Sequence, residues 1–121
     1  MSKPTTSMTF DNFQEFMFNI PIVFSISKTI RQRVMIGKVV MSIQASEYAY
    51  SDPRETGCRE YHSWEIGYPE EVIPELIPYA ESDDYTQTVY GYVPTQIILN
   101  IIDRLGGISL VPNPTQKEET K

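Results

Sequence analysis

The alternation of apolar and polar residues from position 39 to position 46 constrains the fold of this chain more than any other feature. If these residues are extended, one face carries Val39, Met41, Ile43 and Ala45, and the other carries Ser42, Gln44 and Ser46. An apolar face of this kind predicts a strand that is buried on one side. We expect the strand to run over residues 34–50, with Gly37 as a bulge.

Two segments have the helical spacing of apolar residues that would cover such a sheet. After Pro94, which suits the first position of a helix, an apolar stripe continues to Leu105, and Gly106 is a stop signal. Near the N-terminus, Thr9 can cap a helix over residues 9–19, with Phe10, Phe13 and Met17 on one face.

Further strands are predicted from β-branched and aromatic residues between turn signals. We expect strands at 22–30, 60–68, 86–93 and, at an edge, 107–111, although a helix beginning at Pro21 is an alternative for residues 21–33. Residues 51–57 form the loop of a hairpin, and the prolines of segment 69–80 allow only short turns, with Val72, Leu76 and Tyr79 on the sheet. The predicted fold is α+β: an antiparallel sheet of about four strands with an N-terminal and a C-terminal helix packed on one face.

Length and composition indicate one domain over residues 1–121, with flexible tails at 1–8 and 112–121. No apolar run approaches the ~20 residues that a transmembrane helix needs, and a single cysteine allows no disulfide within the chain. We therefore expect a cytoplasmic protein without a membrane segment. The formal net charge of −6 argues against direct binding of nucleic acid or of an anionic membrane.

The charges are unevenly distributed along the chain. Residues 28–38 contain four basic residues and no acid, whereas residues 47–84 contain eleven acids against Arg54 and Arg59. The acidic segment could attract a basic partner through its field.

Catalytic and metal-binding motifs are absent from the sequence. No phosphate-binding glycine loop, nucleophile elbow or paired-histidine metal motif occurs, and a structural zinc site needs more Cys and His ligands than Cys58 and His62 provide. In one extended strand these two residues would lie ~13 Å apart, too far for a nucleophile and its base. We predict no cofactor and no metal.

The aromatic residues point to binding. All five Phe precede residue 25, whereas the eight Tyr and the one Trp lie between residues 48 and 92. Tyr, Trp and Arg are common in binding surfaces. If residues 60–68 are one strand, His62, Trp64 and Tyr68 share a face, and Tyr90 shares a face with Tyr92. The predicted site residues are Arg54, Arg59, Tyr61, His62, Trp64, Tyr68, Glu70, Glu71, Tyr90 and Tyr92.

These features favour a non-enzymatic binding protein that occupies or inhibits a partner protein. Inhibitors of host machinery encoded by phages and mobile elements are one population of such accessory proteins, although these features do not select it. The first alternative is capture of a small nucleotide-like ligand by Arg54, Arg59 and neighbouring aromatic residues. The second is a small enzyme that uses His62 with Glu65 or Cys58. The polar side of the last helix, with Gln96, Leu99, Asn100 and Asp103, suggests a surface for pairing two copies as a homodimer.

Overall fold

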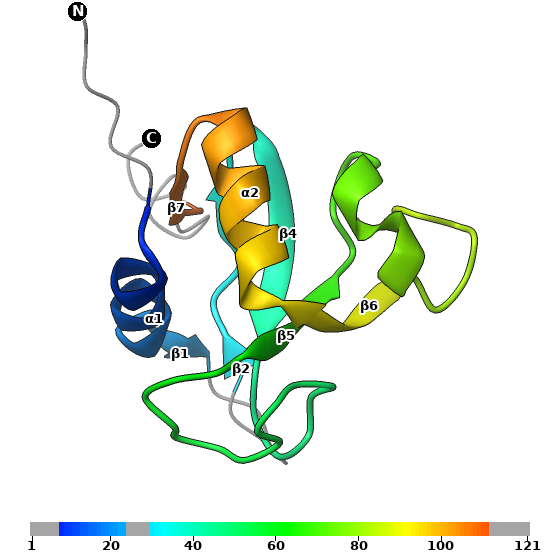
Figure 1. The fold of residues 1–121 in the computed structure, drawn as a ribbon. Coiled ribbons are helices and arrows are strands. Elements are labelled where there is room, and N and C mark those ends of the chain that lie inside the picture. Colours follow the sequence, from blue (N-terminus) through cyan, green and yellow to red (C-terminus); the bar gives the residue numbers. More distant parts are fainter. Residues whose placement is uncertain (1–7, 24–29, 112–121) are drawn as a thin grey trace, which may run out of the picture.

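The computed structural model describes residues 8–23 and 30–111 (Figure 1). In chain order the elements are α1 (Phe10–Phe18), β1 (Ile22–Val23), β2 (Ile30–Arg31), β3 (Val34–Ile36), β4 (Val39–Gln44), β5 (Ser63–Gly67), the 3₁₀ helix η1 (Pro74–Tyr79), β6 (Val89–Pro94), α2 (Thr95–Leu105) and β7 (Ile108–Leu110). Five antiparallel strands form the main sheet in the order β6-β5-β4-β3-β7. The predicted α+β fold with an antiparallel sheet is confirmed, with five strands in place of about four.

The predicted strand over 34–50 is divided by a tight turn. Ile36 pairs with Val39, so Gly37 and Lys38 form a two-residue hairpin loop between β3 and β4. Gly37 has a φ of +60°, and glycine with positive φ at the first loop position is what a type II′ hairpin requires. Gly37 was therefore wrongly predicted as a bulge. A reversal at this point lets the apolar residues of both strands face the same core.

The alternation in β4 produces the expected buried face. Val39, Met41, Ile43 and Ala45 are all buried, and Trp64 and Ile66 of β5 continue the same face. Figure 1 shows α2 lying across this side of the sheet, with α1 beside it. Their buried residues, among them Phe13, Met17, Ile98, Ile101 and Ile102, join the same core cluster. The opposite face, which carries Ser42, Gln44 and Glu65, we call the open face.

Both predicted helices are present, and their ends follow the predicted signals. The Thr9 hydroxyl accepts the backbone N–H of Asn12 at 3.0 Å. At the end of α2, Gly106 takes the left-handed conformation with a φ of +104°. Pro94 is the last residue of β6 and the N-cap of α2. The helix therefore begins at Thr95, one residue later than predicted.

The predicted single strand over 22–30 is wrong. Its ends, β1 and β2, are partners in a two-stranded antiparallel sheet in which Ile22 lies opposite Arg31; residues 24–29 lie outside the described part of the chain. A side chain joins this small sheet to the main one. The Gln44 amide accepts the Arg31 N–H and donates to the Arg31 carbonyl, both at 2.9 Å, as a neighbouring strand would.

Segment 69–80 contains the 3₁₀ helix η1, which begins at Pro74. Leu76 is buried and Tyr79 is partly buried, as expected. Val72 is exposed, and Ile73 takes the predicted core position instead. Next to η1, the backbone also covers the outer edge of β6: Ala80 bridges to Tyr90, and the Glu81 N–H donates to the Val89 carbonyl.

An ion pair joins η1 to α2 and makes stability depend on pH. Arg104 donates to both Glu75 carboxylate oxygens, at 2.5 and 2.6 Å, and these bonds lower the pKa of Glu75. A carboxyl group whose pKa is depressed in the folded state stabilises that state at pH values above its unfolded-state pKa. This stabilisation is lost as the pH falls through the folded-state pKa. Because the pair is near the surface, Glu75→Gln should destabilise by only about 0.5–1 kcal/mol at pH 7. Urea unfolding of both proteins should show this difference shrink as the pH falls below neutral into the acid range, and a difference that stays constant would contradict the assignment.

Among the described residues, no helix is long and apolar enough to cross a membrane. Of the predicted tails, residues 1–7 and 112–121 lie outside the described ranges.

Candidate functional site

The ten residues predicted to bind are divided between the core and the surface. Tyr61, Trp64 and Tyr90 are buried, whereas Arg54, Arg59, His62, Tyr68, Glu70, Glu71 and Tyr92 are exposed. The three buried aromatic residues are therefore not available to a partner at the surface of the folded chain.

Trp64 and Tyr61 hold the helices on the sheet. The indole Nε1–H of Trp64 donates to the Thr95 hydroxyl, which in turn donates to the Tyr61 carbonyl, both at 2.9 Å. The Gln14 side chain accepts the Tyr61 N–H and donates to the same carbonyl. These bonds satisfy buried polar groups at the point where α1, α2 and the sheet meet. Burial raises the pKa of the Tyr61 phenol.

Tyr90 and Tyr92 do not share a face, because β6 contains a bulge. Ile66 pairs with Tyr90 and Trp64 with Val93, so two residues of β6 lie opposite Glu65. The extra residue reverses the alternation: Tyr90 is buried and Tyr92 is exposed. Tyr68 is also directed away from the predicted face, because β5 ends at Gly67.

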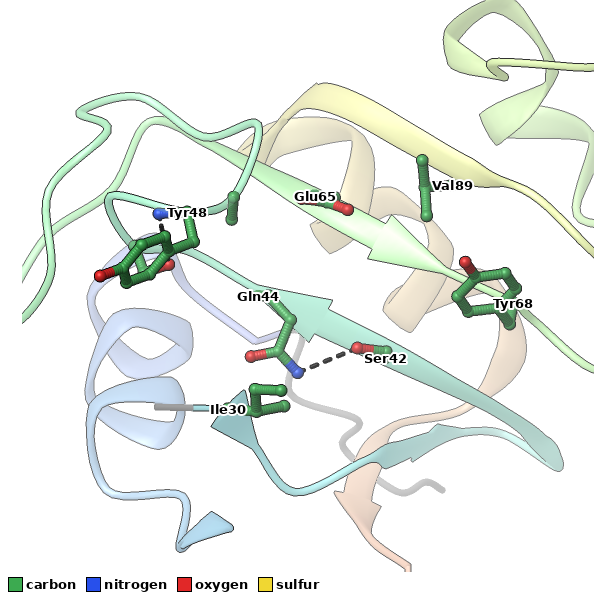
Figure 2. A pocket seen from close by; sticks show the side chains of 9 residues that line it. Ile30, Ser42, Gln44, Tyr48, Glu65, Tyr68 and Val89 are labelled. Atoms are coloured by element: carbon green, nitrogen blue, oxygen red, sulfur yellow. Dashed lines mark hydrogen bonds between the residues drawn. The ribbon is translucent and has the colours of Figure 1, made fainter. Parts of the chain in front are cut away.

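The open face contains a pocket of about 260 Å³. It is lined by Ile30, Ser42, Gln44, Ser46, Tyr48, Ala49, Glu65, Tyr68 and Val89. In Figure 2, Ser42, Gln44 and Glu65 form its floor on β4 and β5, with Tyr48 and Tyr68 at opposite ends. In this view α2 lies behind β4 and β5.

Four exposed tyrosines surround this pocket and its β6 side: Tyr48, Tyr50, Tyr68 and Tyr92, with exposed fractions of 40–53%. We call them the tyrosine face. Tyr50 stacks on Tyr92 with ring centroids 5.8 Å apart, and its N–H donates to the Glu65 carboxylate at 2.9 Å. Tyr68 and Tyr92 both have a φ of +52°, a strained backbone for residues other than glycine.

Acids outnumber bases around the tyrosine face. A hydrogen bond with Glu47 raises the pKa of Tyr48, and Glu70 and Glu71 follow Tyr68 closely in the chain. The bases in contact are Arg33, which donates to the Tyr68 carbonyl, and Arg54, whose guanidinium lies 5.3 Å from the Tyr50 ring centroid. The surface therefore has a negative balance that would favour a cationic ligand.

The structure does not bring Arg54 and Arg59 onto one ring. Arg54 lies over Tyr50, while Arg59 lies over Phe18 of α1, at 4.1 Å from the ring centroid. Two of the neighbouring aromatic residues on which capture of a nucleotide-like ligand would depend, Tyr61 and Trp64, are buried.

The contacts of Cys58 and His62 also differ from those a catalytic pair would make. The Cys58 thiol contacts the Glu55 carboxylate at 3.7 Å, and the His62 imidazole lies 3.6 Å from Glu60. Glu65, the other proposed partner of His62, instead accepts the Tyr50 N–H on the open face.

Sequence reasoning missed part of the open-face pocket. Ser42 and Gln44 were assigned to the polar side of the strand, yet that side was not considered as a site. Tyr48 and Tyr50, near the end of the predicted strand over 34–50, were not among the predicted site residues. The signal available in the sequence was the predicted hairpin of strands 34–50 and 60–68, which brings polar residues of both strands together. In the structure, Glu65 pairs with Gln44.

The polar side of α2 makes contacts within the chain. Leu99 is buried, and the Gln96 amide donates to the Asn100 side chain at 2.9 Å. Leu99 is thus not exposed for contact with a second copy, and a homodimer through α2 stays an untested expectation.

In the described part of the chain, no group of three or more His, Cys, Asp or Glu residues could hold a metal ion. No protein-family model, curated protein or solved structure matches this chain.

Proposed function

We propose that this chain is a binding protein that occupies a partner protein by capturing a basic segment on its open face. The observation that carries the proposal is the pocket between Tyr48 and Tyr68, with the Glu65 carboxylate at its floor. A lysine or arginine side chain could extend along the tyrosine rings, which attract cations, and place its charge against Glu65.

The environment of Glu65 supports this role. Its Oε1 accepts the Tyr50 N–H at 2.9 Å, which fixes the carboxylate on the open face. Glu65 is only partly exposed, so a cation that reaches it would be partly shielded from water. Charged hydrogen bonds are stronger in such a shielded position than in water. The strained backbone at Tyr68 and Tyr92 is a second support, because such strain is concentrated at functional sites.

The proposal is tested with a capped tetra-lysine peptide as the probe, and with tetra-glutamate as the opposite-charge control. Titration followed by NMR should perturb the amides of Ser42, Glu65 and Tyr68 in a saturable way. Glu65→Gln and Tyr68→Ala should each weaken binding about fivefold to tenfold, equivalent to ~1–1.4 kcal/mol. Binding should also weaken as salt rises.

Charge reversal provides matched variants on the two sides of the molecule. Glu70→Lys should weaken peptide binding, whereas Glu15→Lys, the same change of charge on the exposed side of α1, should have a smaller effect. Glu75 is unsuitable for this test because Arg104 already pairs with it. Equal effects of the two substitutions would indicate only a general response to net charge, and the open-face proposal would be rejected.

A further inference from the structure

Arg31 is a partly buried cation held by neutral groups. Its Nε donates to the Met17 carbonyl at 3.2 Å and its Nη1 to the Ala45 carbonyl at 2.8 Å. The guanidinium carbon lies 5.7 Å from the Tyr61 ring centroid and 5.6 Å from that of Trp64. These contacts fix the position of the charge without neutralising it.

No acid among the described residues forms a salt bridge with Arg31; the described ion pairs are His62–Glu60 and Arg104–Glu75. Burial lowers the pKa of the Arg31 guanidinium. A partly desolvated cation is costly unless an anion compensates it, and the groups that hold this guanidinium are the Met17 and Ala45 carbonyls and the Tyr61 phenol.

This cation lines a second pocket, of about 220 Å³, which borders the open-face pocket at Ser46. Its walls are Phe18, Ile22, Arg31, Ala45, Ser46, Thr56 and Gly57. The pocket is smaller than the ~300–1,000 Å³ that accommodates drug-sized ligands, so its occupant must be small.

Two hydroxyl groups add hydrogen-bond donors to this pocket. Ser46 Oγ accepts the Tyr48 N–H, and Thr56 Oγ1 accepts the Glu47 N–H. Because each oxygen is used as an acceptor, its own proton can be donated to a ligand. Phe18 and Ile22 supply an apolar wall and are themselves exposed.

We infer that this pocket binds a small organic monocarboxylate with an apolar group. The carboxylate would accept hydrogen bonds from the Arg31 guanidinium and from a hydroxyl of Ser46 or Thr56, and the apolar group would lie against Phe18 and Ile22. One guanidinium suits one carboxylate, since the two groups form parallel hydrogen bonds.

The probe is sodium benzoate, titrated into the isotope-labelled chain at constant ionic strength. We expect saturable NMR changes at the Arg31 Nε–H and at the Thr56 and Gly57 amides, with a dissociation constant of roughly 1 mM. Benzamide, which keeps the ring and lacks the charge, and acetate, which keeps the charge and lacks the ring, should each bind at least about tenfold more weakly. Linear changes without saturation, or equal binding of benzoate and benzamide, would overturn the inference.

A pair of variants at Ile22 tests the same site from the protein side. Ile22 lies directly opposite Arg31 in the β1–β2 pair, so Ile22→Asp places a carboxylate beside the guanidinium. This variant should fold and should bind benzoate at least about tenfold more weakly, whereas Ile22→Asn, of the same size without the charge, should lose less. Equal affinities of the two variants would contradict an anion site at Arg31. Ser46 lines both pockets. The amides of Glu65 and Tyr68, which line only the open-face pocket, should not respond to benzoate, and this keeps the result independent of the peptide test.

Discussion

Replacing Trp64 with alanine is expected to lower the free energy of unfolding by about 3–5 kcal/mol, a large part of the total for a domain of this size. Trp64 is only 1% exposed and packs edge-on against Phe13, with ring centroids 5.3 Å apart. The substitution leaves a cavity and also removes the hydrogen bond that the indole donates to Thr95. Urea unfolding followed by circular dichroism, analysed with a common slope, measures the change.

Two control variants separate a core role for Trp64 from a role in binding. Trp64→Phe retains an aromatic ring and should destabilise less than Trp64→Ala. Tyr68→Ala removes an exposed ring, and alanine disfavours the positive φ at this position as tyrosine does. This variant should therefore alter stability by less than about 0.5 kcal/mol. A Trp64→Ala protein as stable as the wild type would show that Trp64 does not hold the helices on the sheet.

Gly37→Ala is expected to destabilise the chain by about 2–5 kcal/mol, through two separable effects. A residue with a Cβ at positive φ is disfavoured by roughly 1–2 kcal/mol. In addition, a Cβ at position 37 would lie 2.7 Å from the Leu105 carbonyl oxygen and 3.0 Å from its Cβ, and crowding of this kind typically costs a further 1–3 kcal/mol, roughly. The hairpin turn and the end of α2 would have to move apart.

Gly57→Ala is the matched control for this substitution. Gly57 also has a positive φ, of +87°, but an added Cβ would meet no atom within 4 Å. Its substitution should therefore show only the backbone effect, about 1–2 kcal/mol. Thermal unfolding of both variants gives the comparison, and similar losses would mean that the close approach of Gly37 to Leu105 does not restrict the fold.

Much of the fold follows from local patterns in the sequence. The alternation at 39–46 predicts the buried face of β4, and the caps at Thr9 and Gly106 predict helix ends, because these signals depend on neighbouring residues alone. The division at Gly37 and the pairing of β1 with β2 depend on how segments meet in space. A glycine between two apolar runs is compatible with a bulge or a hairpin, and only the packing of both strands on one core selects the hairpin.

The candidate site was less predictable than the fold, because small backbone irregularities decide which tyrosines are exposed. The bulge in β6 places Tyr90 in the core and Tyr92 outside, and the end of β5 before Tyr68 moves that ring to the open face. Arg31 belonged to a basic segment, but its isolation from acids could not be read from charge spacing. Such isolation arises from the contact of β2 with α1 and the end of β4.

The cover over the outer edge of β6 has a consequence for how copies of this chain behave at high concentration. Unpaired edge strands promote aggregation because another strand can add to them. Ala80 and Glu81 already bond to Tyr90 and Val89 there, and β7, at the other end of the sheet, has three residues. The molecule can therefore present an uncovered sheet face to a ligand while offering little backbone on which a fibril could grow.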